Sequence, residues 1–295
     1  MHSRSPGAPF ATSIGDWFSL HARQLPWREP SRTPWSVLVS ELMLQQTPVS
    51  RVLPVYHAWL RRWPTPAALA AAPAGEAVRM WGKLGYPRRA LRLHGCAVAI
   101  TEQHAGQVPN TLAELLALPG VGDYTARAVL AFAFGRRAAV VDINVRRVLA
   151  RAVEGHGQPG PASSRRDLAL MEAVLPDTDA EAAQFCAAIM ELGALVCTAT
   201  KPACAQCPIA AGCSWRLAGY PSYYGPVTRP QRFAGTDRQV RGLLLDVLRA
   251  ADGPVPQDAL DLAWPAAIQR QRAQDSLVAD GLLDPLPDGR FALPF

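Results

Sequence analysis

Four cysteines within 17 residues are the residues whose spacing predicts chemistry most directly. They follow the pattern Cys-x6-Cys-x2-Cys-x5-Cys and are Cys197, Cys204, Cys207 and Cys213. The N-terminus carries no apolar signal core, so the six cysteines of the chain indicate metal binding before disulfides. Four thiolates in one loop can hold either zinc or a 4Fe–4S cluster, and the spacing alone leaves both open. The other two, Cys96 and Cys186, lie in apolar helical segments and are expected to be inert.

Two single carboxylates in apolar surroundings are candidates for acid–base chemistry. Glu41 lies in the segment WSVLVSELMLQQT at 35–47, and Asp142 follows an apolar run. Burial should raise the pKa of Glu41, because an apolar environment disfavours the charged form. An exposed helical Glu and a helix N-cap Asp are the ordinary alternatives for these two positions. Gln45 and Gln46 follow Glu41 as uncharged hydrogen-bonding side chains, which suit a groove better than a phosphate contact.

A glycine-containing turn between two helices is the element that should position a polyanion. The sequence predicts helices at 111–118 and 123–134, joined by the turn LPGVG at 118–122. Gly120 and Gly122 allow backbone angles and close approaches that other residues disfavour. The second helix would direct unpaired backbone N–H groups toward a phosphate. An ordinary helix–turn–helix joint is the alternative.

Two further segments combine aromatic and basic residues. Trp27 and Arg28 are either surface residues or a platform on which an extruded base stacks. The loop at 82–89 contains glycines, Tyr86 and paired arginines, which is typical of a wedge that also contacts phosphates. A plain helix–helix loop is the alternative.

The periodicity up to residue 220 is helical, with almost no strand signal, so we expect an all-α region. Besides the two helices of the turn motif, helices are predicted at 14–23, 35–47, 67–72, 76–81, 88–103, 145–153, 167–175 and 180–197. Residues 1–10 are predicted to be a disordered lead.

The last part of the chain differs in charge and pattern. Residues 221–295 contain eight Arg and nine Asp, whereas residues 1–220 contain 22 basic and 15 acidic residues. After a linker at 220–232, the sequence predicts three helices and a hairpin, at 238–251, 257–263, 265–280 and around Asp288-Gly289. We therefore expect a catalytic domain at 1–220 and a small winged-helix-like domain at 221–295. A helical tail that only packs on the main domain is the alternative.

The net charge of +6 and the pI near 9.2 favour a polyanionic partner for residues 1–220. Arginine supplies nearly all of that charge, since Lys83 and Lys201 are the only lysines. No stretch is long and apolar enough to span a membrane, so we expect a cytoplasmic protein with no membrane partner.

Together these segments resemble the helix–hairpin–helix DNA glycosylases with an iron–sulfur loop. Within that superfamily the chain is most similar to the adenine DNA glycosylases that act on A/G mismatches. The resemblance covers about residues 14–216. The matching motifs are LPWR at 25–28, SELMLQQT at 40–47, LGY at 84–86, LPGVGDYTA at 118–126, VDINVRRVLAR at 141–151, MELGALVC at 190–197 and the full cysteine spacing.

The resemblance implies a fold, a cofactor and a reaction. The fold would contain a six-helix barrel with the helix–hairpin–helix and a subdomain with the cysteine loop, and the cofactor would be a 4Fe–4S cluster. The partner would be double-stranded DNA with an adenine mispair, bound by a monomer. The enzyme would remove adenine opposite 8-oxoguanine or guanine. It would protonate N7 of adenine with a carboxylic acid and stabilise the cationic deoxyribose with a carboxylate, as retaining glycosidases do.

The resemblance also assigns roles to individual residues. It implies that Glu41 is the catalytic acid, and that Asp142 faces the sugar with support from Tyr124 and Asn144. The adenine pocket would be lined by Trp27, Arg28, Glu191, and Leu44 or its neighbours. The residues implied to enter the base stack are Gln45 and Tyr86. The hairpin amides at Gly120 and Gly122 would hold phosphates.

Two departures from related enzymes matter for function. Bifunctional lyases of the superfamily carry a lysine at the position of Tyr124, so the resemblance implies a monofunctional glycosylase here. Many adenine glycosylases carry a C-terminal domain similar to the Nudix hydrolases, whereas residues 221–295 are too short for one. A thymine or uracil mismatch glycosylase and a non-catalytic iron–sulfur DNA-binding protein are the alternatives, and the presence of Glu41 and Glu191 argues against the first of these.

Overall fold

The computed structural model describes residues 8–225 and 232–295, and their secondary structure is almost entirely helical. The prediction of an all-α protein is confirmed. The chain divides into two compact units. One consists of Met1–Val37, Asn110–Leu112 and Gly122–Thr228, and the other of Leu38–Pro109, Ala113–Val121 and Arg229–Phe295.

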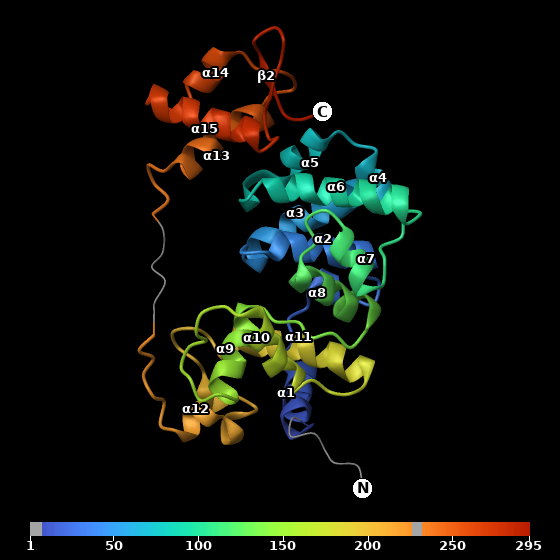
Figure 1. The fold of residues 1–295 in the computed structure, drawn as a ribbon, viewed down its shortest axis with the longest axis vertical. Helices are drawn as coiled ribbons and strands as arrows, with labels where there is room; N and C mark the ends of the chain where they lie inside the picture. The colour runs from blue at the N-terminus through green and yellow to red at the C-terminus, as the bar shows by residue number, and fades with distance from the viewer. Residues whose placement is uncertain (1–7, 226–231) are drawn as a thin grey trace. The chain divides into compact units, whose positions relative to one another are not determined.

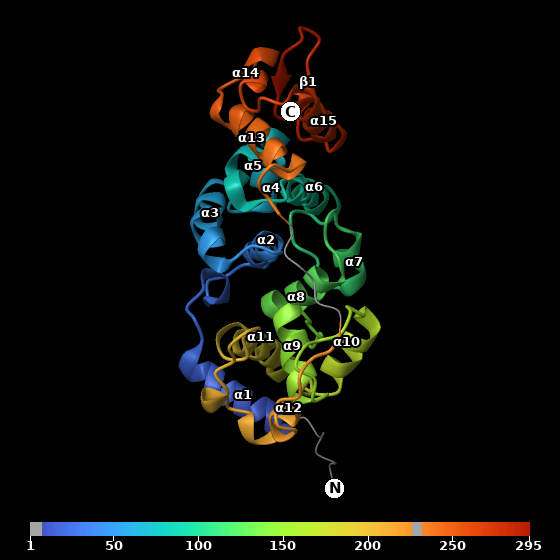
Figure 2. The same ribbon diagram turned by 90° about the vertical axis from the view of Figure 1, so that its left-hand side faces the viewer.

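The first unit is organised around helix α11 (Asp179–Leu195). Helices α9 (Ile143–Ala152), α1 (Ala8–His21) and α8 (Asp123–Phe134) pack against it (Figure 2). Helices α10 (Ser164–Glu172) and α12 (Ser214–Leu217) pack against α9. The short helix η1 (Pro26–Arg28) and the two turns of the cysteine loop, η3 (Cys204–Gln206) and η4 (Ala210–Gly212), also belong to this unit.

Two helices of this unit approach each other closely where α11 meets the start of α9. A Cβ added to Gly193 would lie 2.8 Å from Cβ of Asn144 and 2.9 Å from its carbonyl oxygen. Only a residue without a side chain therefore allows the two helices to come this close.

The second unit contains most of α2 (Pro34–Leu44), followed by a stack of short helices. These are α3 (Val49–Arg62), α4 (Pro66–Ala70), α5 (Ala74–Trp81), η2 (Gly82–Leu84), α6 (Arg88–Gln103) and α7 (Leu112–Ala117). Helix α6 packs against α4 and α5. The fully buried ring of Trp59 meets Trp63 and Trp81 edge to face, with centroids 4.7 and 5.8 Å apart.

The predicted helices agree with the structure, but α3 and the short α12 were not predicted. The predictions for 88–103 and 123–134 match α6 and α8 residue for residue. Helix α3 was not predicted from the sequence, and it contains a proline at Pro54. Pro48 is the N-cap of α3 and Pro54 lies inside the helix, where apolar side chains in a helical period still bury one face. Residues 1–7 lie outside the described residues, and α1 already begins at Ala8.

The C-terminal part contains the predicted three helices and terminal hairpin. Helices α13 (Asp237–Ala250), α14 (Gln257–Asp261) and α15 (Ala267–Ala279) precede strands β1 (Asp284–Pro285) and β2 (Phe291–Ala292). The strands pair antiparallel, with Asp284 opposite Ala292, and the turn between them contains the predicted Asp288-Gly289. Part of the predicted linker, residues 226–231, lies outside the described residues.

This C-terminal module packs on α5, which belongs to the same unit (Figure 1). Nη1 of Arg79 donates hydrogen bonds to the carbonyl oxygens of Leu248, Arg249 and Ala251 near the end of α13. In return, Nε of Arg249 donates to the carbonyl oxygen of Val78 at 3.1 Å. The backbone N–H of Gly75 donates to the carbonyl oxygen of Pro294 at 2.6 Å, so the module is attached through the end of α13 and through its C-terminal residues.

Within residues 8–225 and 232–295, no helix has both the length and the apolar character needed to cross a bilayer.

Candidate active site and cysteine loop

Glu41 lies on α2 with a side chain that is almost inaccessible to water. The residue is 5% exposed, and its helical neighbours Leu38, Leu42 and Met43 are buried too. The alternative of an exposed helical Glu is therefore wrong. Burial is the condition on which the sequence-based expectation of an acidic role for Glu41 depends, because an apolar environment penalises the charged form of a carboxyl group.

The end of α2 leads into two of the predicted DNA-contacting residues. The helix ends at Leu44, and Gln45 and Gln46 follow in the loop. Gln46 is exposed and adopts a φ of +53°, which is uncommon for a residue with a side chain. Such conformations are costly and often occur where function needs them.

Tyr86 has the same unusual backbone conformation. It follows η2 with a φ of +48°, and 53% of its surface is exposed. An exposed aromatic residue on a strained turn is a suitable wedge between bases. Glu41, Gln45, Gln46 and Tyr86 all belong to the second unit.

Asp142 in the first unit is the N-cap of α9, as its sequence position suggested. One carboxylate oxygen accepts a hydrogen bond from the backbone N–H of Val145 at 2.7 Å, and the other accepts one from Nδ2 of Asn144 at 2.7 Å. Burial raises the pKa of Asp142 above its ordinary value, while these hydrogen bonds and the charge of Arg147 oppose the rise. The capping role leaves the predicted role at the sugar open, and that role stays a prediction.

Asn144 connects Asp142 to the first cysteine. Nη2 of Arg147 donates to Oδ1 of Asn144 at 2.9 Å and to the carbonyl oxygen of Gly193 at 2.6 Å. Nε of the same arginine donates to the carbonyl oxygen of Cys197 at 2.6 Å. A single buried guanidinium thus joins the start of α9, the end of α11 and the start of the cysteine loop.

Glu191 lies at the centre of a buried ion cluster in the first unit. It is 0% exposed, and its two carboxylate oxygens accept hydrogen bonds from Nε and Nη2 of Arg23 at 2.7 and 2.8 Å. Nη2 of Arg28 also donates to it at 3.0 Å. Burial alone would raise the pKa of Glu191, but the hydrogen bonds from both arginines outweigh it and lower the pKa to about 2. Glu191 is therefore ionised at neutral pH.

The sequence predicted Arg28 and Glu191 in one pocket, and the structure brings them together. Trp27 is buried beside them on η1. Nη1 of Arg28 is buried and has no hydrogen-bond partner among the described residues, so a donor there is available to a ligand or water. Arg23 was not predicted, although a basic residue close before LPWR was a visible signal.

The hairpin residues lie in the predicted turn. Gly120 has a φ of +78°, and a Cβ there would lie 2.6 Å from Cβ of Arg92. The backbone conformation and the steric contact therefore both disfavour a side chain at this position. Gly122 is the N-cap of α8 and makes no side-chain cap. Tyr124 is the second residue of α8 and is partly buried.

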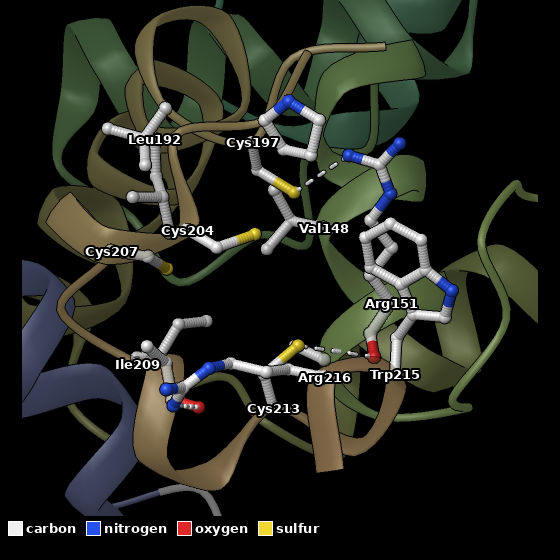
Figure 3. A pocket seen from close by; sticks show the side chains of 14 residues that line it. Val148, Arg151, Leu192, Cys197, Cys204, Cys207, Ile209, Cys213, Trp215 and Arg216 are labelled. Atoms are coloured by element: carbon white, nitrogen blue, oxygen red, sulfur yellow. Dashed lines mark hydrogen bonds between the residues drawn. The ribbon is translucent and has the colours of Figure 1, made fainter. Parts of the chain in front are cut away.

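The four predicted cysteines line one pocket together with apolar side chains of α9 and α11 (Figure 3). The pocket also contacts two cationic side chains, Arg151 and Arg216. Nη1 of Arg151 donates to Sγ of Cys197 at 3.4 Å, and its guanidinium lies 4.7 Å from the ring centroid of Trp215. Four sulfur donors with an adjacent cation suit an anionic cluster with thiolate ligands. Cys96 and Cys186 are buried elsewhere, as expected.

Comparison with known proteins defines the class. Residues 39–173 match the family described as HhH-GPD superfamily base excision DNA repair protein, and residues 197–213 match the iron–sulfur binding domain of endonuclease III. The solved structure of a thermostable thymine-DNA glycosylase is 28% identical, with a TM-score of 0.63 over 71% of this chain and 95% of that chain. A non-covalent Endonuclease III–DNA complex is 22% identical, with a TM-score of 0.61 over 74% and 99%. The fold is that of the DNA glycosylases of base excision repair.

A curated relative narrows this class to one family. The adenine DNA glycosylase of Mycobacterium tuberculosis is 55% identical over 284 residues, which cover 96% of this chain and 93% of the relative. The chain belongs to the adenine DNA glycosylase family. It is a DNA-binding N-glycosylase of base excision repair, and its cofactor is a 4Fe–4S cluster. The predicted family and cofactor are confirmed.

The cluster is expected to depend on the loop cysteines and not on the two buried ones. Protein purified without oxygen should contain about four iron and four sulfide ions per chain. Cys204→Ser should lower both, because a hydroxyl is a poor substitute for a thiolate ligand. Cys96→Ala is the control and should leave them unchanged. Iron and sulfide analysis with the visible absorption spectrum measures this, and zinc without iron in the wild-type protein would contradict it.

Proposed function

We propose that this enzyme removes adenine that is mispaired with 8-oxoguanine or guanine in double-stranded DNA. The reaction would be hydrolysis of the N-glycosidic bond without strand cleavage. The observation that carries the proposal is the burial of Glu41 among apolar side chains, because adenine is a poor leaving group until a neutral acid protonates its N7.

The proposed reaction divides the chemistry between two carboxyl groups. Glu41 gives its proton to N7, and the bonding electrons between C1′ and N9 move onto the departing adenine. Asp142, ionised and held by Val145 and Asn144, stabilises the positive charge that develops on the deoxyribose. Water then adds to C1′ and loses a proton, which leaves an abasic site.

Recognition of the base is proposed for the Glu191 cluster. The anionic carboxylate of Glu191 can accept a hydrogen bond from an exocyclic amine, and the unpaired Nη1 of Arg28 can donate one to a ring nitrogen. Such a combination favours adenine over thymine and uracil, which present a carbonyl oxygen where adenine has an amine. The 4Fe–4S cluster would contribute no step of the bond cleavage. When bound, the 4Fe–4S cluster would fold the loop that presents Lys201 and nearby backbone to phosphate.

A panel of duplexes tests the function. Duplexes containing A opposite 8-oxoguanine, A·G, A·C, T·G and U·G are incubated with excess enzyme, and abasic sites are scored by alkaline cleavage. We expect excision from the first two, and rapid excision from T·G or U·G would favour a pyrimidine mismatch glycosylase. The predicted monomer and cytoplasmic location stay predictions.

The enzyme is expected to lack β-lyase activity, because Tyr124 offers no amine for a Schiff base with C1′. Borohydride should trap at most a weak adduct on substrate DNA, while Tyr124→Lys serves as the variant that supplies an amine. Denaturing gels measure the trapped fraction. A strong wild-type adduct that disappears on changing Lys83 or Lys201 would contradict this expectation.

We propose that residues 221–295 act as a domain that supports the catalytic domain at 1–220. Arg270 and Arg272 on the third helix and Arg290 after the hairpin turn are in positions where winged-helix domains contact DNA. Each of them pairs with a carboxylate of the module itself. These ion pairs reduce the charge available to phosphates, so a contribution to DNA affinity should be small.

Truncation after Tyr220 is therefore expected to affect stability more than chemistry. The loss of the contacts to Gly75, Val78 and Arg79 should lower the Tm by roughly 5 °C. Single-turnover excision at saturating enzyme should persist, because every candidate catalytic residue precedes residue 221. Thermal unfolding, excision kinetics and DNA binding measure the three effects. Loss of excision by folded, cluster-containing protein would contradict the supporting role.

A further inference from the structure

Arg89 in the first turn of α6 is a buried cation that no carboxylate neutralises among the described residues. It is 5% exposed. Its Nη1 donates to the carbonyl oxygens of Leu42, Met43 and Gln45 at 2.9, 3.1 and 2.5 Å. Its Nη2 donates to Oγ1 of Thr47 at 2.9 Å and to the carbonyl oxygen of Gly85 at 3.1 Å.

These five acceptors belong to two segments of the second unit. Leu42, Met43 and Gln45 lie in or directly after the last turn of α2, where carbonyl oxygens lack helical partners and carry partial negative charge. Gly85 lies in the turn before α6. The guanidinium thus neutralises a helix C-terminus and joins it to a turn 40 residues further along the chain.

Each of the two segments contains a residue in the left-handed region. Gln46 has a φ of +53° and follows Gln45, and Tyr86 has a φ of +48° and follows Gly85. Arg89 therefore binds the carbonyl oxygen directly before each strained residue. A strained conformation persists only where its surroundings fix it.

The aromatic contacts fix the turn further. The Arg89 guanidinium lies 5.2 Å from the ring centroid of Trp81 and 5.4 Å from that of Tyr86. Nε1 of Trp81 also donates to the carbonyl oxygen of Gly85 at 3.0 Å. The exposed Tyr86 ring is thus attached to a cation that also holds the end of α2.

We propose that Arg89 is a positioning residue that sets the separation and orientation of Gln46 and Tyr86, and thereby the preference for mispaired over matched DNA. The proposal rests on the proposed function and on the sequence-based expectation that Tyr86 enters the base stack while the loop after α2, with Gln45 and Gln46, contacts the DNA beside it. Two rigidly spaced probes distinguish a deformable mispair from a matched pair, because the energy needed to unstack a base pair is lower at a mismatch.

The alternative is that Arg89 only closes the core of the second unit. Arg89→Lys separates the two ideas, since lysine keeps the charge but cannot span two segments with a planar fork. Arg249→Lys is the matched control. Arg249 is also a largely buried arginine of this unit and donates to the carbonyl oxygen of Val78, away from Gln46 and Tyr86.

The experiment compares full-length, cluster-containing wild type, Arg89→Lys and Arg249→Lys. The Kd is measured for a duplex with a non-hydrolysable 2′-fluoro adenosine opposite 8-oxoguanine and for the matched duplex. The preference is expressed as the Kd for the matched duplex divided by the Kd for the mispair duplex. We expect Arg89→Lys to lower this ratio about tenfold by weakening mispair binding, with matched-duplex binding unchanged. Arg249→Lys should leave the ratio unchanged. Fluorescence of 2-aminopurine next to the mispair should show less base unstacking with Arg89→Lys than with wild type, and no change with Arg249→Lys.

Thr47→Val provides a milder variant if Arg89→Lys does not fold, because it removes one acceptor of Nη2 while keeping the side-chain volume. It should lower the ratio in the same direction, by a smaller factor. An unchanged ratio in a folded Arg89→Lys or Thr47→Val protein would overturn the proposal. Equal losses in Arg89→Lys and Arg249→Lys would do the same. If wild type itself shows no preference for the adenine mispair, the proposed function fails, and this outcome is distinct from the other two.

Discussion

Glu41→Gln is expected to reduce single-turnover adenine excision by about 10³-fold, within the range that general acid catalysis contributes. The amide has nearly the same shape as the carboxyl group but cannot protonate N7. Because Glu41 is 5% exposed, the change removes no surface charge that could hold DNA, so the Kd for duplex should change little. Quenched-flow kinetics with enzyme in excess and a parallel binding titration measure the two effects.

Glu102→Gln is the matched control for this variant. Glu102 lies on α6 in the same unit and is exposed, so the same replacement of a carboxyl group by an amide should leave excision at the wild-type rate. Near-normal excision by Glu41→Gln would show that another group acts as the acid.

Asp142→Asn is expected to lower excision by two to four orders of magnitude, on the order of what one well-placed charge contributes in a low-dielectric site. Asn is a good N-cap, so Oδ1 can still accept from the N–H of Val145 and the helix should stay intact. The new amide would face Nδ2 of Asn144, whose Oδ1 already accepts from Arg147, and two donors would oppose each other.

Asp142→Ala separates the capping role from the charge. It should lose both the charge and the cap, with a stability loss of about 1 kcal/mol that Asp142→Asn largely avoids. Thermal unfolding alongside single-turnover kinetics measures this. If both variants lost stability equally and Asp142→Asn kept its rate, the carboxylate would have only a capping role.

The raised pKa of Asp142 also predicts the acid limb of the rate profile. The ionised form is the active one, so activity should fall as the pH falls through the folded-state pKa. Burial raises that pKa, and the decline should therefore begin at a higher pH than an exposed Asp would give.

Local patterns in the sequence predicted those parts of the molecule that local physics determines. The helices α6 and α8 follow from apolar periodicity, and the N-cap role of Asp142 follows from its place before a helix. The cysteine spacing placed four sulfur atoms on one pocket. Helix α3 was not predicted; it contains Pro54, and burial of Tyr56 and Trp59 stabilises the helix nonetheless.

Contacts between distant segments were not predictable from one sequence. Arg23 binds Glu191, which lies 168 positions later in the chain, and Arg89 donates hydrogen bonds to residues more than 40 positions earlier. The residues that a single arginine contacts cannot be predicted from the periodicity or spacing of the sequence around it. The prediction that Glu191 lines a pocket was made from a motif, whereas its ionisation is understood only from the two guanidinium groups around it.

The left-handed conformations of Gln46 and Tyr86 lower the stability of the fold at two positions that are proposed to serve repair. For residues with a side chain, each conformation costs about 1 kcal/mol that glycine would avoid. Variants selected only for heat resistance should therefore drift toward glycine at both positions. Selection for a low mutation rate should retain the amide and the aromatic ring. The two selections act in opposite directions on the same two codons, so a thermostabilised form of this enzyme is best engineered elsewhere in the chain.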